Sequence, residues 1–180
     1  FQIIHSSFIK EENQNNDKCR IRLYNETNTL SYHFWRNIMK VYEHKVQYYE
    51  TDKMQITHHS NYIRFMEEAR IDFLDQIGWG YDKMEEQGIL SPVVGVTCEY
   101  KKATSFPDIL RISIRVLELS AAKLSLGYTM TVSDKVVCTA SSTHCFLNQN
   151  GRPINLKKQY PAFYSLLESL KAESGQGNVR

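Results

Sequence analysis

The sequence lacks several features that would each mark a particular class of protein. Its 180 residues contain no apolar run near the roughly 20 residues of a membrane-spanning helix, so membrane insertion is not expected. The formal net charge of +2 is too small to favour nucleic acid as a partner. The cysteines show neither C-x-x-C spacing nor the density of a disulfide framework, so we expect reduced thiols. Reduced thiols are typical of a cytoplasmic protein, which is the location we expect. The cysteines are Cys19, Cys98, Cys138 and Cys145.

The local signatures of several hydrolase classes are also missing. The sequence has no G-x-S-x-G elbow and no local cysteine–histidine signature, which argues against a covalent serine or cysteine nucleophile. No H-E-x-x-H motif is present. His58 and His59 are adjacent, so their side chains point in different directions, and no second cluster accompanies them. A bound metal is therefore not expected.

The composition changes at Met39. Over the whole chain, 42% hydrophobic and 23% charged residues are ordinary for a globular domain, and the length fits one domain. The stretch EENQNNDK at 11–18, by contrast, is polar and typical of a disordered chain. We expect residues 39–180 to form the domain and residues 1–38 to be an extension outside its core. Either Met39 is the natural start and the extension comes from upstream translation or an added sequence, or the extension is an ordered arm.

From Val41 onward, the hydrophobic periodicity predicts helices and strands in a clear order. Apolar residues that recur every three or four positions predict a helix about five turns long with one apolar face. Gly78 stands where a C-terminal cap of this helix belongs. That face consists of Tyr62, Phe65, Met66, Ala69, Phe73 and Ile77. Period-two alternation predicts strands, and only Asp134–Lys135 separates the last two, a turn of hairpin size. The predicted strands are 41–49, 94–100, 110–116, 124–132 and 136–147, and the predicted helices are 60–77, 81–87 and 160–171.

This order predicts an α+β fold. A helix that is apolar along one face must be covered, and one curved antiparallel sheet of five strands wrapped around it is the most economical cover. Such a sheet leaves its edge strands exposed. We therefore expect edge-to-edge pairing of two copies.

A polar junction separates the first strand from the long helix. Asp52 lies at this junction, where an aspartate is most often a loop residue or a helix cap. The alternative is a general base beside the helix N-terminus, whose unpaired N–H groups can polarise a carbonyl oxygen. Lys101 and Lys102, at the end of a predicted strand, are ordinarily solvated but could meet phosphate groups.

Two stretches together resemble a known family. They are the run Y-x-E-T-D-x-M-x-x-x-H-H-S-N-Y from Tyr48 to Tyr62, and PVVGVTCEYKKAT from Pro92 to Thr104. Both are similar to the hotdog-fold acyl-CoA thioesterases, in particular the 4-hydroxybenzoyl-CoA thioesterase type that includes the enzyme associated with the bacterial Tol–Pal cluster. The resemblance extends over residues 41–167. It implies a hotdog fold, in which a long central helix is wrapped by a five-stranded antiparallel sheet.

The resemblance also implies roles for individual residues. It places the catalytic carboxylate at Asp52 and the backbone N–H that meets the thioester carbonyl at His59, with a contribution from Tyr48. Tyr62 matches a tyrosine that we expect to be structural or to line the pocket. The family uses no metal and no bound cofactor, and coenzyme A is part of the substrate. Its members are dimers or tetramers with each site built across the subunit interface.

The sequence departs from the family at Gln55. Relatives usually carry glycine three residues after the aspartate, where glycine allows a left-handed turn or a close approach of the thioester. Gln55 is therefore expected to reshape or narrow the acyl pocket. Another hotdog branch places its acid on the long helix, and there Glu67 would be the nearest substitute. Asp52 lies in the better-matched motif and is our choice.

The sequence therefore predicts hydrolysis of an acyl-CoA to a carboxylic acid and coenzyme A. A non-catalytic hotdog module that binds acyl thioesters is the first alternative. An enzyme that acts on acyl carrier protein thioesters or hydrates an enoyl thioester is the second. The acyl chain, the choice between dimer and tetramer, and the role of Asp52 as general base or nucleophile stay open.

Overall fold

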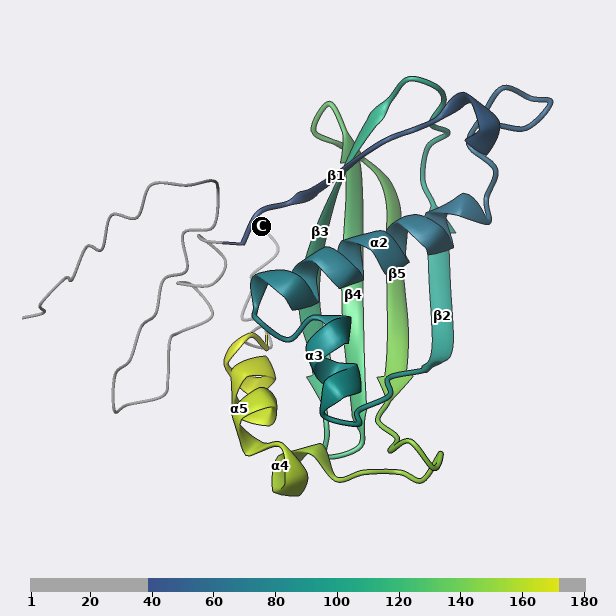
Figure 1. Cartoon of the computed structure of the whole chain (residues 1–180). Coiled ribbons are helices and arrows are strands. Elements are labelled where there is room, and N and C mark those ends of the chain that lie inside the picture. Colours follow the sequence, from purple (N-terminus) through teal and green to yellow (C-terminus); the bar gives the residue numbers. More distant parts are fainter. Residues whose placement is uncertain (1–38, 172–180) are drawn as a thin grey trace, which may run out of the picture.

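The computed structural model describes residues 39–171, and in them a five-stranded antiparallel sheet curves around one long helix (Figure 1). The strand order across the sheet is β1-β3-β4-β5-β2. This confirms the predicted α+β fold, whereas the predicted extension, residues 1–38, lies outside the described part of the chain. The elements are β1 (Tyr42–Lys45), the 3₁₀ turn η1 (Tyr48–Glu50), α2 (Asn61–Gln76), α3 (Tyr81–Glu86), β2 (Val93–Tyr100), β3 (Ile109–Leu119), β4 (Lys123–Val132), β5 (Lys135–Cys145), α4 (Leu156–Gln159) and α5 (Pro161–Ser169).

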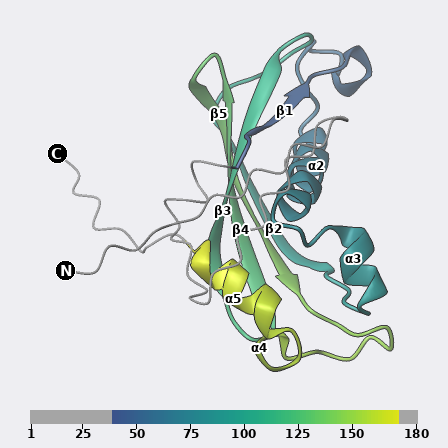
Figure 2. The ribbon, with the colours of Figure 1, turned by 60° about the vertical axis from the view of Figure 1, so that its left-hand side comes forward.

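The core lies between α2 and the sheet. Figure 2 shows α2 and α3 on the same side of the sheet. The apolar residues predicted to form one face of the helix are all buried, as the spacing of three and four requires. Apolar side chains at alternate positions of the central strands β3 and β4 pack against that face. Near the end of α2, Trp79 stacks on Phe163 of α5 with ring centroids 4.3 Å apart.

The first strand is shorter than the sequence predicted. The expected strand at 41–49 ends at Lys45, and residues 48–50 form the 3₁₀ turn. The chain turns here because the Glu50 carboxylate accepts the backbone N–H of Gln47 at 2.7 Å, a local contact that competes with strand pairing. The second half of that strand prediction was wrong.

The turn and cap predictions differ little from the structure. The β4–β5 hairpin turns at Ser133–Asp134, one residue earlier than expected, and both residues have positive φ (48° and 63°). Two adjacent residues with positive φ form the type of turn that matches strand twist. Gly78 has φ 72° just beyond α2, which confirms its predicted role at the helix end.

Strand β2 forms one edge of the sheet and is exposed along most of its length. Its apolar side chains include Val94 and Tyr100, which are 54% and 48% exposed. An edge strand with unpaired backbone groups and exposed apolar side chains is a surface on which another strand can pair. Within residues 39–171, no helix has the length and apolar character needed to cross a membrane.

Candidate active site

The polar junction forms a tight loop between η1 and the start of α2. Thr51 and Thr57 pair as an isolated antiparallel bridge, and the N–H of Asp52 donates to the Ile56 carbonyl at 2.9 Å. At the tip, the N–H of Gln55 donates to the Asp52 carbonyl at 2.9 Å. Gln55 has φ 62°, the left-handed conformation that glycine adopts at lower cost. The chain therefore keeps the backbone shape that the glycine of the resembled family would allow.

Asp52 is half-buried in this loop. Its Oδ1 accepts the N–H of Met54 at 2.7 Å, so the side chain stabilises its own turn and does not cap the helix. No hydrogen bond within residues 39–171 involves Oδ2. The carboxylate is thus fixed in orientation by one oxygen and retains an acceptor on the other.

The start of α2 carries no side-chain cap. Ser60 occupies the N-cap position, but its hydroxyl lies 2.8 Å from Nδ1 of His58 and satisfies no backbone N–H of the first turn. The backbone N–H of Asn61 donates to the His58 carbonyl at 3.0 Å, whereas that of His59 has no acceptor in the described part of the chain. The His59 N–H is therefore an unpaired donor next to the positive pole of the helix.

Tyr100 of β2 holds the His59 peptide from the other side. Its hydroxyl donates to the His59 carbonyl at 3.0 Å. Partial burial, together with the neighbouring Cys98 thiol, raises the pKa of Tyr100 to about 12, so the phenol keeps its proton. Cys98 and Cys138 of β5 have their sulfur atoms 3.3 Å apart, and this hydrogen bond lowers the pKa of Cys98 to about 7.

A cavity of about 980 Å³ opens beside the loop. Three residues singled out from the sequence line it: Tyr48, Asp52 and Gln55. The structure also adds residues that sequence reasoning did not single out for the site. The lining residues that were not singled out include Tyr49, Thr51, Lys53, Ser105 and Phe106.

Other expected site residues lie outside this lining. His59 is exposed next to it, and its neighbours His58 and Ser60 line the cavity. Tyr62 is buried, and its hydroxyl lies 2.9 Å from the Thr104 hydroxyl, so it belongs to the core beneath the site.

The two lysines lie at the end of β2. Both Lys101 and Lys102 donate their backbone N–H to the Val137 carbonyl, at 2.8 and 3.1 Å. The ammonium group of Lys101 pairs with Glu99 on the surface. Within one copy of the chain, neither lysine lines the cavity.

Sequence reasoning also missed Glu50, which belongs to η1 and does not itself line the cavity. It is buried, and its carboxylate lies 2.9 Å from Nε2 of His44 on β1. The only signal in the sequence was its place in the matched motif, two residues before Asp52. A glutamate next to tyrosines in a strand-like run gives no indication of burial.

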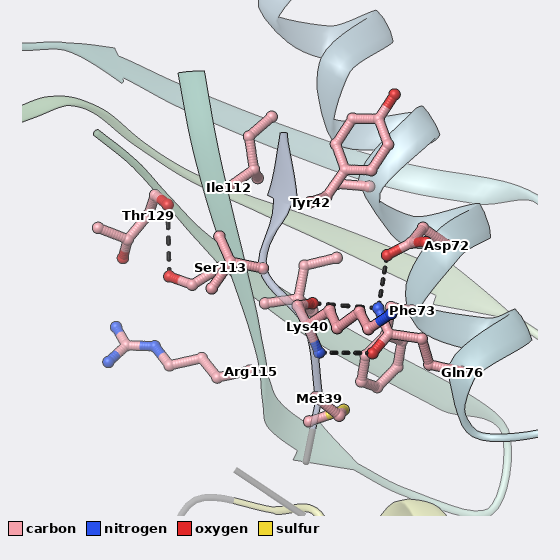
Figure 3. A pocket seen from close by; sticks show the side chains of 13 residues that line it. Met39, Lys40, Tyr42, Asp72, Phe73, Gln76, Ile112, Ser113, Arg115 and Thr129 are labelled. Carbon is pink, nitrogen blue, oxygen red and sulfur yellow. Dashed lines mark hydrogen bonds between the residues drawn. The ribbon is translucent and has the colours of Figure 1, made fainter. Parts of the chain in front are cut away.

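A second cavity, of about 460 Å³, lies between β1, β3 and the C-terminal half of α2 (Figure 3). There the Gln76 side chain accepts the Lys40 N–H at 2.7 Å and donates to the Lys40 carbonyl at 3.0 Å, as a neighbouring strand would. Its lining contains none of the residues that the sequence analysis proposed as catalytic or substrate-binding. The loop with Asp52 is therefore the stronger candidate for chemistry.

Comparison with known proteins gives a consistent picture. The thioesterase-like superfamily matches residues 46–171. A provisionally assigned esterase from Aquifex aeolicus is 36% identical over 119 residues, which are 66% of this chain and 92% of that protein. A provisionally assigned acyl-CoA thioesterase from Bacillus subtilis is 30% identical over 131 residues, 72% of this chain and 95% of that protein. Among solved structures, the DHNA-CoA thioesterase from Staphylococcus aureus is 27% identical with a TM-score of 0.71, covering 78% of this chain and 96% of that one.

Proposed function

The chain belongs to the thioesterase-like superfamily, and from that premise we propose that it hydrolyses acyl-CoA with Asp52 as its catalytic carboxylate. It is a thioester hydrolase, and acyl-CoA is the substrate class for which its relatives are named. One observation carries the assignment of the site. A half-buried carboxylate and an uncapped helix start lie at one open cavity.

Each side of this site has a separate task in the reaction. The backbone N–H of His59 stabilises the negative charge that grows on the thioester oxygen, and loss of such a donor typically costs about 10²–10³-fold in rate. Asp52 either takes a proton from a water molecule that attacks the carbonyl, or attacks the carbonyl itself to form a mixed anhydride that water then hydrolyses. On both routes the C–S bond breaks and coenzyme A leaves as its thiolate, which then takes up a proton. The N–H of Met54 supports either route because it holds the carboxylate through Oδ1, while Oδ2 accepts no hydrogen bond from residues 39–171. General-base help is typically about 10²–10⁴-fold.

Tyr48 and Gln55 are proposed to contact the substrate. Tyr48 is 78% exposed on the cavity wall, and its ring meets Phe106 edge-on with centroids 6.0 Å apart. Gln55 projects a longer side chain than the family's glycine from the same wall. Lys101 and Lys102 are proposed to bind the phosphates of coenzyme A, because both are exposed cations at the end of the free edge β2.

We further propose that two copies pair along β2 to form a dimer, or a tetramer built from such dimers. The exposed edge and its apolar side chains support this arrangement. Each site would then be completed by the partner, which would bring β2 of one copy close to the cavity of the other. The finer assignment to the 4-hydroxybenzoyl-CoA thioesterase type and its Tol–Pal branch, and a cytoplasmic location, belong to the same proposal.

The decisive experiment is Asp52→Asn, assayed by release of free thiol from a panel of acyl-CoA esters. The variant should keep its fold and its affinity for coenzyme A but lose about 10²–10⁴-fold in kcat. Asp134→Asn makes the same chemical change in the β4–β5 turn, where asparagine also tolerates positive φ, and should not affect turnover. Turnover of Asp52→Asn within a few-fold of the parent would rule out Asp52. If no ester of the panel is hydrolysed by the parent but coenzyme A still binds, the chain is a binding module instead.

A further inference from the structure

Glu50 is a buried carboxylate with no part in the proposed chemistry. Its side chain is 8% exposed and does not line the cavity. Burial of an ionised carboxylate is costly unless hydrogen bonds compensate for the lost water. Here Oε2 accepts the N–H of Gln47 at 2.7 Å and lies 2.9 Å from Nε2 of His44. The carboxylate of Glu50 is therefore bound to β1 through His44.

The backbone carbonyl of Glu50 accepts hydrogen bonds from residues at the start of α2. It accepts the backbone N–H of His58 at 2.8 Å and the side-chain amide of Asn61, also at 2.8 Å. Glu50 thus joins three segments: β1, the 3₁₀ turn to which it belongs, and the first residues of α2. Tyr48 and Asp52 lie two residues to either side of it, and His59 directly follows its partner His58.

A second carboxylate, that of Glu68, contacts the other ring nitrogen of His44. Nδ1 of His44 lies 2.9 Å from Oε2 of Glu68, which is on α2, and the Tyr42 hydroxyl donates to the same oxygen at 3.0 Å. The imidazole also packs on Phe65 with ring centroids 4.0 Å apart. His44 is therefore anchored to the rigid middle of α2, and Glu50 is anchored to His44.

We propose that Glu50, held by His44, is the positioning residue that sets the distance between the Asp52 carboxylate and the His59 N–H. The role rests on the proposed function, because it requires both groups to act on one thioester. Misplacement of a reacting group by about 1 Å can cost about 10²-fold in rate. Glu50 does not line the cavity, so its loss should affect the chemical step and leave substrate affinity nearly unchanged.

The test compares kcat and KM of Glu50→Ala with those of two further variants. Glu50→Ala should lower kcat about 10–10²-fold with KM within a few-fold of the parent. Glu50→Gln keeps the length and an acceptor oxygen for the Gln47 N–H but loses the charge, so it should recover part of kcat. Glu43→Ala removes an exposed carboxylate of β1, next to His44 and paired at 3.3 Å with Arg111, and should match the parent.

A double-mutant cycle separates a shared link from two independent contacts. If Glu50 acts through His44, the losses of kcat in Glu50→Ala and His44→Ala should not multiply in the double variant. Multiplicative losses would overturn the link through His44. If Glu50→Ala does not fold, Glu50→Gln carries the test, and a kcat equal to the parent's would overturn the inference.

The outcomes also separate this inference from the proposed function. An inactive Asp52→Asn alongside a fully active, folded Glu50→Ala would overturn the positioning role and leave the catalytic assignment standing. An active Asp52→Asn would overturn the catalytic assignment and the positioning role with it. A fall in kcat/KM caused only by a higher KM would mean that Glu50 shapes the binding surface, which also contradicts positioning.

Discussion

His144 makes the stability of the fold depend on pH in a way that one substitution can test. It lies on β5 and is 1% exposed. Its Nε2 is 2.7 Å from the Ser142 hydroxyl, and that hydroxyl also lies 2.8 Å from the Tyr128 hydroxyl. Nδ1 is buried with no partner in the described part of the chain. Burial, assisted by the charge of Arg70, lowers the pKa of His144 from 6.5 to about 4. The folded protein therefore holds this imidazole neutral.

The sign and size of the effect follow from proton linkage. Between pH 6.5 and about 4 the unfolded chain binds a proton at this histidine that the folded chain does not, so folded stability falls as the pH drops through this window. Above pH 6.5 neither state is protonated here, and below about pH 4 both are, so the effect is flat outside the window. A shift of this size corresponds to a loss of about 3 kcal/mol across it.

The assay is urea denaturation of the parent and of His144→Gln at several pH values from 7 to 4. The free energy of unfolding of the parent should fall by about 3 kcal/mol more than that of the variant, because acidic side chains contribute equally to both. His59→Gln makes the same substitution at an exposed histidine and serves as the matched control. Parallel curves for the parent and His144→Gln would refute the assignment of a depressed pKa to this residue.

Two further predictions concern the loop and the thiol pair. Gln55→Gly should raise the free energy of unfolding by about 1 kcal/mol, because φ 62° is less costly for glycine; a lower melting temperature would contradict this. Cys98 should be alkylated by iodoacetamide with a midpoint near pH 7, because a hydrogen bond from the Cys138 thiol lowers its pKa to about 7. Peptide mass spectrometry should show that Cys138→Ala moves this midpoint upward and leaves alkylation of Cys145 unchanged, whereas an unmoved midpoint would exclude the thiol hydrogen bond as the cause.

Much of the fold could be predicted from the sequence because burial leaves a local pattern. The long helix was expected at 60–77 and is observed as Asn61–Gln76, since one buried face forces apolar residues to recur every three or four positions. The four later strands were predicted for the same kind of reason at period two. Asp52 was singled out as the candidate carboxylate through its motif, and Gly78 was recognised as the helix end from its place after the helix.

The remaining features depended on particular hydrogen bonds that leave no pattern along the sequence. The first strand pairs with β3 only as far as Lys45, because the Glu50 carboxylate turns the chain at Gln47. Lys101 and Lys102 lie outside the cavity because the end of β2 bonds to Val137 of β5.

The sequence by itself determined the α+β fold, the long helix and the aspartate at its entrance, since each leaves a pattern within a few neighbouring residues. Only the tertiary structure decided that Glu50 is buried and that Gln55 takes the left-handed conformation. A charged glutamate is buried only where partners such as His44 and Gln47 compensate for its lost water, and the fold brings those partners together. Positive φ is energetically costly for a residue other than glycine. The hydrogen bonds of the surrounding loop offset this cost and hold Gln55 in the left-handed conformation.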